Sequence, residues 1–282
     1  MSIALFASAL IPLAFQSAGR AVSVEKEVPA NYLGFDRNIF PGGGALPILR
    51  KTFAFSAYWL NAPPGEKTNT WLGQRELLRA HGFGFLLLFR GPLSRELKDE
   101  SAAAEKGTRD ARNAASAAKS EGFPGQAIIF LDIEEGGRLP AAYHSYLRAW
   151  TAELSHAGYR AGAYCSGIPV KEPGAAITTA DDIRAHAPSK DFVFFIFNDV
   201  CPPSPGCTFP QNPPSPAIGG IPYAEVWQFA QSPRRTERTV HCAPGYHKDG
   251  NCYVPGDAAH AWFLDVDTAD SSDPSNAATT SK

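Results

Sequence analysis

Eight short apolar runs recur along the chain and constrain its fold more than any other feature. They cover residues 32–36, 52–58, 83–89, 127–132, 159–165, 192–197, 225–229 and 262–266. Most are continuously apolar, which is typical of parallel strands buried on both faces. Their number, and their spread over roughly 240 residues, favour an α/β fold that closes into a single (β/α)8 TIM barrel.

Helical patterns separate several of these runs and support the same fold. They cover residues 72–80, 107–120, 141–156 and 179–187. In the third pattern, Tyr143, Leu147, Trp150 and Leu154 fall on one helical face. Strands that alternate with helices indicate a parallel sheet.

The two ends of the chain depart from this alternation. Residues 3–15 form an apolar run that is too short to span a bilayer and is typical of a signal peptide. We therefore expect residues 1–21 to direct export; a buried first helix or a misplaced start codon are the alternatives. The barrel should cover residues 30–269. Residues 270–282 are rich in Ser, Asp, Asn, Thr and Ala, and we expect a flexible tail there.

Composition excludes some classes of partner. The net charge is −2 and no long basic run occurs, which argues against nucleic acid. The glycine triplet at 42–44 lacks the lysine and helix pattern of a phosphate-binding loop, and no dinucleotide fingerprint is present. We expect a monomer without a cofactor or a stable membrane span.

Acidic residues gather where three of the predicted strands end. Asp36 ends the first, Asp132 and Glu134 end the fourth, and Asp265 and Asp267 end the eighth. In a parallel barrel this end carries the active site, because the loops converge there. Strand alternation puts the two carboxylates of each pair on one face, opposite apolar neighbours that would pack on helices.

A ring of carboxylates has a chemical consequence. The charges repel one another, so some of the pKa values should rise. One carboxyl group can then stay protonated near neutral pH while another is ionised, which is the division of labour that glycoside hydrolysis needs. For any single residue, a helix cap or a solvated turn carboxylate is the alternative.

Short motifs in this order resemble a known family. They are Gly34-Phe35-Asp36, Gly107-x-x-Asp110-Ala111, Gly122-Phe123-Pro124, Asp132-Ile133-Glu134, Trp227-Gln228-Phe229 and Asp265-Val266-Asp267. Together they look like the glycoside-hydrolase-like barrels of domain of unknown function 1906. That family is similar to the family 25 glycoside hydrolases, the muramidases that cut peptidoglycan.

The resemblance implies a TIM barrel with Glu134 as the general acid. It implies that Asp132 orients or stabilises the substrate, by positioning an N-acetyl group, and that Asp36 and Asp265 line the same cleft. Asp267 stands where muramidases carry a polar Asn or Asp. The second predicted strand departs from the muramidase pattern, because no carboxylate ends it.

Aromatic and polar residues at other strand ends are candidates for binding sugar, since flat rings stack on sugars and polar groups bind hydroxyls. Besides Asp267, they are Tyr58, Trp59, Arg90, Tyr164, Asn198, Trp227 and Gln228. Arg90 ends a strongly apolar strand and needs an anionic partner, which we expect to be a cleft carboxylate. Core packing is the alternative for each aromatic residue.

The chain has five cysteines. Two local disulfides, Cys201 with Cys207 and Cys242 with Cys252, are the simplest interpretation for an exported protein. We expect Cys165 to be a buried thiol and expect no metal site. The alternative is a zinc site formed by His241, Cys242, His247 and Cys252, although its spacing matches no compact zinc knuckle.

The sequence therefore predicts an exported glycoside hydrolase that acts on peptidoglycan or a related N-acetylated glycan. The competing hypothesis is a non-catalytic barrel that binds cell-wall glycan or a protein partner. A barrel mouth blocked by the Pro-rich loop at 201–216 would favour that hypothesis. A cytoplasmic structural protein is the third class, which five reduced cysteines and an intact N-terminus would favour.

Overall fold

The computed structural model describes residues 31–278 apart from 187, 188 and 244. The expected signal peptide at 1–21 and the last four residues of the chain lie outside the described residues. Within them, the strands of the predicted barrel all form, and most begin or end within one or two residues of the predicted bounds.

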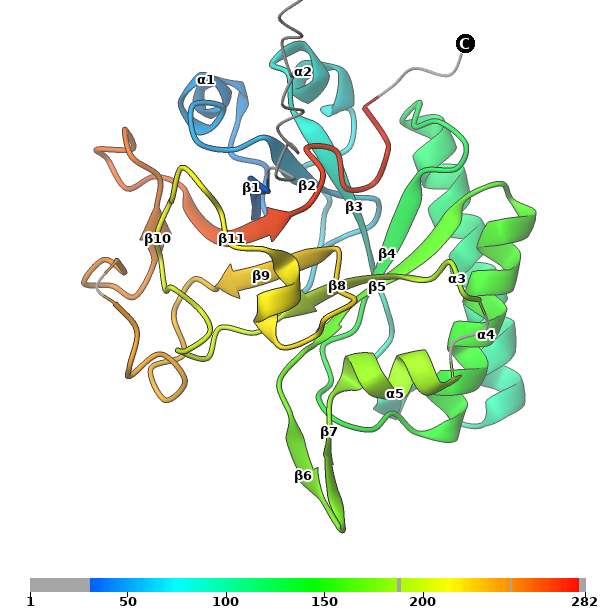
Figure 1. The fold of residues 1–282 in the computed structure, drawn as a ribbon. Coiled ribbons are helices and arrows are strands. Elements are labelled where there is room, and N and C mark those ends of the chain that lie inside the picture. Colours follow the sequence, from blue (N-terminus) through cyan, green and yellow to red (C-terminus); the bar gives the residue numbers. More distant parts are fainter. Residues whose placement is uncertain (1–30, 187–188, 244, 279–282) are drawn as a thin grey trace, which may run out of the picture.

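The eight predicted runs form a closed barrel (Figure 1). Closure arises because the last barrel strand pairs with both its predecessor and the first strand. This confirms the α/β barrel expected from the sequence. The strands are β1 (Tyr32–Asp36), β2 (Phe55–Trp59), β3 (Gly84–Arg90), β4 (Ile128–Asp132), β5 (Arg160–Ser166), β8 (Val193–Phe197), β9 (Val226–Ala230) and β11 (Phe263–Ala269).

The direction of β11 differs from the all-parallel arrangement of a standard (β/α)8 barrel. β11 runs antiparallel to both β9 and β1. Between β9 and β11 the described chain forms only irregular loops and the short strand β10 (Cys252–Tyr253), which pairs with the start of β11. Because no helix carries the chain back to the other end of the barrel, the last strand has to return in the opposite direction.

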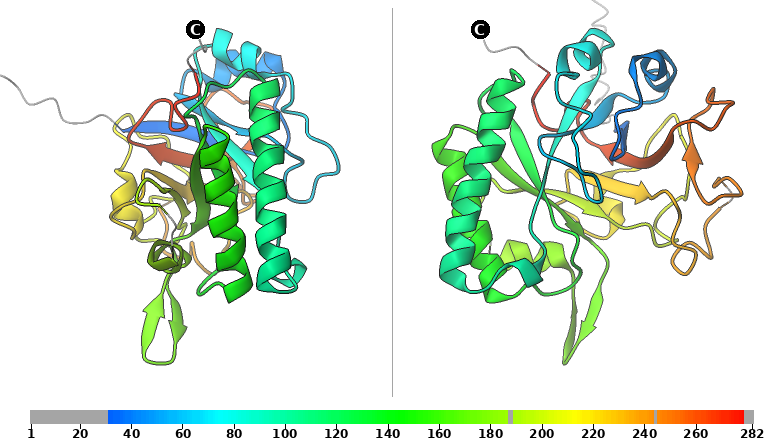
Figure 2. Two further views of the ribbon diagram at one scale, coloured as in Figure 1. Left: turned by 90° about the vertical axis from the view of Figure 1, so that its right-hand side faces the viewer. Right: turned by 180° about the vertical axis from the view of Figure 1, so that it is seen from behind.

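Helices cover the outside of the barrel after each of its first five strands. They are α1 (Leu46–Leu49), α2 (Arg75–Ala80), α3 (Glu100–Ser120), α4 (Ala141–His156) and α5 (Thr179–His186). The long helices α3 and α4 lie side by side (Figure 2). Their backbones approach closely at Gly107, where a methyl group would collide with the carbonyl of Tyr146. A hairpin of β6 (Val170–Glu172) and β7 (Ala175–Ile177) projects between β5 and α5 (Figure 1).

Residues 270–278 contradict the expected flexible tail. The Ser275 N–H donates to the carbonyl of Phe85 at 2.9 Å, and its own carbonyl accepts from the Ile128 N–H at 2.9 Å. The carboxylate of Asp273 accepts from the Phe85 N–H, also at 2.9 Å. This segment therefore bridges β3 and β4 near their amino ends. The segment has few large apolar side chains to bury. It is ordered instead by hydrogen bonds to backbone groups of β3 and β4.

The disulfides also differ from the expected local pairs. Cys201 pairs with Cys242 and Cys207 with Cys252, with Cα–Cα distances of 5.0 and 5.5 Å. These bonds join the loop after β8 to the loop after β9, and they remove both cysteines of the alternative zinc site as thiolate ligands. Cys165 is a free, buried thiol, as predicted.

The Pro-rich loop at 201–216 runs to the opposite end of the barrel from the acidic residues. Phe209 packs edge-on against Phe53, which precedes β2. The carbonyl of Pro214 accepts from the Thr268 hydroxyl at 2.8 Å, near the end of β11. Phe53 and Thr268 both lie at the amino end of the parallel strands. Phe209 and Pro214 therefore lie at the opposite end of the barrel from the acidic residues.

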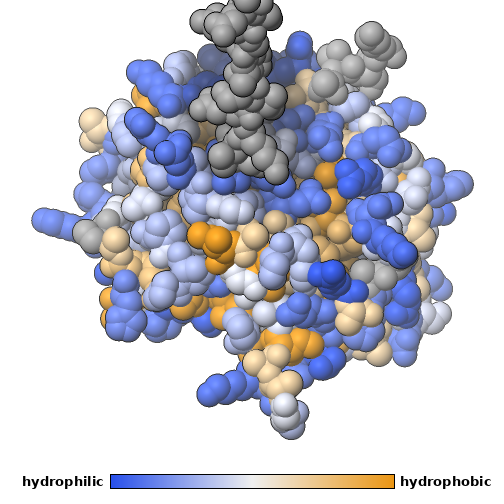
Figure 3. Space-filling model, viewed as in Figure 1, coloured by the Kyte–Doolittle hydropathy of each residue, from blue (hydrophilic) through white to orange (hydrophobic). Residues whose placement is uncertain are grey.

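The surface is mainly hydrophilic on the face seen in Figure 3, with apolar side chains in small separate groups. The exposed large apolar residues of the described chain are Ile39, Leu72, Leu77, Val170, Ile218, Val240 and Phe263. None of the helices in the described ranges combines the length and apolar character needed to cross a membrane.

Candidate active site

Five carboxylates lie around the mouth of the barrel. Asp36 is the last residue of β1 and lies directly opposite Asp265 of β11. Asp132 ends β4, and Glu134 follows two residues later. Asp267 lies two residues further along β11. Because β11 is antiparallel, Asp265 is at the rim and Asp267 lies deeper, the reverse of the order expected for a parallel last strand.

Gly34 explains why the first motif begins with glycine. It lies two residues before Asp36 and so shares its face of β1. A methyl group at Gly34 would collide with the ring of Phe55 on β2. The ring therefore occupies the barrel interior next to Gly34, and the Gly-x-Asp spacing places a carboxylate immediately above it.

Tyr164 on β5 shows that the carboxylates converge. Its ring is buried, and burial is the main reason that its pKa is raised. The charges of Glu134, Asp132, Asp265 and Asp36 raise that pKa further. One side chain thus experiences the charges of four of the five acidic residues, which places them near one another at this end of the barrel.

Burial controls the protonation of Asp36. Desolvation is the largest cause that raises its pKa from 3.8 to about 7, and the charge of Glu134 adds to it. The Trp59 indole and the Arg37 backbone N–H lower the pKa. Within the described chain, however, the indole nitrogen does not reach hydrogen-bond geometry. Asp36 therefore carries a proton in a large fraction of molecules near neutral pH.

Asp132 and Asp267 are more deeply buried. Desolvation raises the pKa of each, and neighbouring carboxylates raise it further. Among the residues that the structure describes, no group hydrogen-bonds either oxygen of either carboxylate. Buried polar groups without partners are costly, and they mark positions where a ligand can supply the missing contacts.

Glu134 combines a raised pKa with access to solvent. It is exposed at the mouth. Desolvation there and the charge of Glu135 raise its pKa, while Arg235 lowers it. A carboxyl group that a substrate can reach, and that holds its proton to higher pH than usual, has the two properties of a general acid.

A hydrogen-bonded trio of side chains lies near the carboxylates. The Tyr164 hydroxyl donates to Gln228 Oε1 at 2.8 Å, and Gln231 donates to the same oxygen at 2.8 Å and to the Tyr164 hydroxyl at 3.2 Å. Gln228 also lies close enough to Asp267 to lower its pKa. Tyr164 and Gln228 thus lie where the sequence predicted, whereas Gln231 follows β9 and was missed.

Sequence reasoning also missed an ion pair at this end of the barrel. Arg235 forms a bidentate pair with the fully buried Asp199 and lies over the ring of Phe197. Asp199 stands just beyond the end of β8, so the strand-end rule could have found it. Arg235 belongs to the irregular loop after β9, and no local pattern marks it.

Arg37 and Phe263 line a small pocket beside the Asp36–Asp265 pair. The pocket measures about 130 Å³. The Arg37 guanidinium lies 5.2 Å from the centre of the Phe263 ring. Burial lowers the pKa of Arg37, and the charges of Asp257 and Asp265 oppose that shift.

Three predicted sugar-binding residues lie elsewhere. Tyr58 points to the outer face of the barrel, where it is fully buried against Trp71 and Phe123. Its hydroxyl donates a hydrogen bond to the carboxylate of Glu121. Adjacent residues of a strand point to opposite faces, and Trp59 rather than Tyr58 faces the cavity.

The same rule places Trp227 on the outside, because its neighbour Gln228 points inward. Trp227 is fully buried and donates to the carbonyl of Asn198 at 2.9 Å. The Asn198 amide is engaged as well, donating to the carbonyl of Gly219 at 2.7 Å and accepting from Val200. Both residues therefore hold the wall of the barrel.

Arg90 lies in register with Asp132 on the neighbouring strand and lowers the pKa of that carboxyl. The two side chains form no ion pair within the described residues, so the expected carboxylate partner of Arg90 stays a prediction. Trp59 faces the cavity but is only 3 % exposed. It therefore presents little ring surface on which a sugar could stack.

The chain thus folds into a closed α/β barrel with acidic residues at the carboxyl end of its parallel strands. Residues 61–193, just under half of the chain, match the model of the Rv2525c-like, glycoside hydrolase-like domain family. The matched region includes Asp132 and Glu134. No curated protein shows significant sequence similarity to the chain.

Solved structures confirm the fold. An uncharacterized protein from B. stearothermophilus has a TM-score of 0.56 at 18% identity, over 84% of this chain and 95% of that one. The glycosyl hydrolase 25 GHIP of Streptococcus pneumoniae has a TM-score of 0.50 at 10% identity, over 84% and 86%. The catalytic domain of endolysin ply40, from bacteriophage P40 of Listeria monocytogenes, has 0.50 at 15% identity, over 87% and 95%.

Proposed function

We propose that this protein hydrolyses glycosidic bonds of peptidoglycan or a related N-acetylated glycan. The observation that carries the proposal is the contrast between Glu134 and its acidic neighbours. Glu134 is exposed with a raised pKa, whereas Asp132 and Asp36 lie buried beside it. Glycoside hydrolysis requires such a division between a proton donor and carboxylates in fixed positions.

In the proposed reaction, Glu134 donates its proton to the oxygen of the leaving sugar. As the C–O bond to the leaving sugar breaks, positive charge develops at the anomeric carbon of the ring that remains, and neighbouring carboxylates stabilise that charge. Water then adds to this carbon and returns a proton to Glu134. Asp132 orients the N-acetyl group of the substrate. Burial and the charge of Asp36 raise the pKa of Asp265, while the Ser232 N–H, which donates to its Oδ1 at 2.6 Å, acts in the opposite direction.

The course of the Pro-rich loop supports hydrolysis over passive binding. Within the loop at 201–216, Phe209 and Pro214 contact the opposite end of the barrel. This part of the loop therefore does not cover Glu134. Export is part of the proposal, and the two disulfides support it because such bonds persist in oxidising compartments.

The test is digestion of purified insoluble peptidoglycan, with release of reducing sugar ends as the readout. Release that rises with time supports hydrolysis, and mass spectrometry of the fragments identifies the bond that is cut. Retention on peptidoglycan in a pull-down without release would instead favour a non-catalytic barrel. Absence of both would overturn the assignment of cell-wall glycan as substrate.

A further inference from the structure

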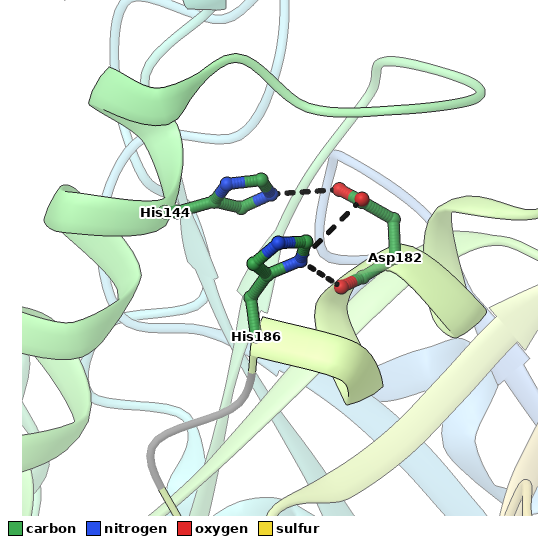
Figure 4. A group of neighbouring side chains, drawn as sticks. All are labelled: His144, Asp182 and His186. Atoms are coloured by element: carbon green, nitrogen blue, oxygen red, sulfur yellow. Dashed lines mark hydrogen bonds and ion pairs between the residues drawn. The ribbon is translucent and has the colours of Figure 1, made fainter.

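A second cluster of polar side chains lies away from the carboxylates, where α5 meets α4. Figure 4 shows His144 of α4 and His186 of α5 directed toward the carboxylate of Asp182. The ring of His144 places its Nε2 atom 2.8 Å from Asp182 Oδ2. His186 Nδ1 lies 2.8 Å from the Asp182 carbonyl and 3.5 Å from Oδ1.

We propose that His144, Asp182 and His186 form a site for a divalent transition-metal ion of the Zn²⁺ class. Each residue offers one ligand atom, and these atoms all lie within 4.8 Å of one another. Two imidazoles and one carboxylate are a common donor set for such ions. Ligand atoms around zinc lie about 3.0–3.5 Å apart, so a small inward rotation of one side chain completes the site.

His186 can make that rotation. Its side chain is 40% exposed, whereas Asp182 is completely buried and His144 nearly so. Asp182 and His186 are four residues apart on one helix, which puts both on the same face. The fixed pair thus supplies two ligands, and the exposed histidine closes the site from the solvent side.

The two histidine rings are stacked on each other. Their centroids are 3.9 Å apart with an interplanar angle of 13°. The stacking holds both rings next to the same carboxylate. A bound ion would take the place of the hydrogen bond between His144 and Asp182.

Two groups hold the carboxylate of Asp182, and a bound ion would leave one of them in place. The Leu139 N–H donates to Oδ2 at 2.9 Å, and backbone partners of this kind commonly orient metal-binding carboxylates. Arg138 lies 3.3 Å from Oδ1 and also pairs with Glu172 at 3.1 Å. Since Glu172 can hold the guanidinium alone, Arg138 is a competing cation that a metal ion can displace.

The position gives the site a structural role. Residues 134–139 form a loop after β4. Its Leu139 donates a backbone hydrogen bond to Asp182. Near its start, the carbonyl of Glu135 accepts from the Thr179 hydroxyl of α5 at 3.2 Å. A metal ion between α4 and α5 would therefore fix this loop at its far end. The inference is independent of the proposed hydrolysis, because binding can be measured without substrate.

The test is titration of the untagged, chelator-treated full chain with Co²⁺ and Zn²⁺. We expect one equivalent of Co²⁺ to give visible d–d absorption, which Zn²⁺ abolishes by competition. His186→Ala should weaken binding at least tenfold, and Asp182→Asn should do the same. Arg138→Gln should bind at least as tightly as the wild type, because it removes the competing cation.

His156→Ala is the matched control, since His156 is an exposed histidine on α4 away from the cluster. A second pair of neighbouring histidines is His247 and His260, whose ring centroids lie 4.1 Å apart. His247→Ala tests whether this pair contributes to binding. Both variants should bind as the wild type does. Folding of each variant is checked by circular dichroism. Absence of stoichiometric binding, or unchanged binding by folded His186→Ala, would overturn the proposal.

Discussion

Asp36 and Asp265 face each other directly across the antiparallel pair β1–β11. Opposed residues of such a pair have Cα atoms about 4.5–5.5 Å apart, so the two carboxyl groups share one small space. The charge of Asp36 raises the pKa of Asp265. The reversed last strand thus places Asp265 opposite Asp36, and it leaves Asp267 below the pair.

This burial makes stability depend on pH. The pKa of Asp36 is 3.8 when unfolded and about 7 in the barrel. The folded protein therefore binds more protons between these values. The stability that Asp36 contributes is therefore present in full below pH 4 and is lost as the pH rises through 7. For an isolated group, the free energy of unfolding changes by about 4 kcal/mol over this range.

We expect Asp36→Asn to unfold at a higher temperature than the wild type at pH 8 and to lose much of this pH dependence. Asp191→Asn, which alters an exposed carboxylate, is the control and should follow the wild-type curve. Thermal melts from pH 4 to pH 8 provide the measurement. Parallel curves for Asp36→Asn and the wild type would show that Asp36 is not desolvated as described.

Glu135→Gln should move the pH profile of hydrolysis without abolishing activity. The charge of Glu135 raises the pKa of Glu134, and the amide retains the oxygen that accepts from the Ser94 N–H. Glu134 should then lose its proton at lower pH. The basic limb of kcat/KM should shift down by roughly half a pH unit, as expected for one partly screened charge. A shift to higher pH would contradict this electrostatic account.

Tryptic mapping without reduction distinguishes the crossed disulfides from local ones. Cys201 and Cys207 share one tryptic peptide, since no Lys or Arg separates them, whereas Lys248 separates Cys242 from Cys252. Crossed bonds join three peptides into one species. Local bonds would release the Cys201–Cys207 peptide alone, and that product would refute the crossed pairing.

Gly34→Ala should destabilise the protein by about 1–3 kcal/mol, because the added methyl group meets the ring of Phe55 in a filled barrel. Gly44→Ala is the matched control, since a methyl group there has open space around it. Urea unfolding measures both variants. Equal stability of the two would show that the barrel interior can accommodate the methyl group.

Sequence patterns predicted the strands well, because a continuous apolar run is a local feature, and the same runs place Asp132 and Glu134 at the end of β4. Strand alternation, applied to β2 and β9, would have excluded Tyr58 and Trp227, since Trp59 and Gln228 occupy the inward positions. The direction of β11, the crossed disulfides and the order of residues 270–278 depend on distant partners. Ser275, for example, is ordered by Phe85 and Ile128, which no local pattern indicates.

The central claim is that Glu134 donates the proton that breaks the glycosidic bond. The most direct measurement is the rate of reducing-end release from peptidoglycan by the wild type, Glu134→Gln and the matched control Glu135→Gln at the wild-type pH optimum. Glu134→Gln should fold and bind glycan normally but react about 10²–10⁴-fold more slowly, the usual contribution of a positioned acid, while Glu135→Gln stays within tenfold of the wild type. Equal rates for Glu134→Gln and the wild type would contradict the claim.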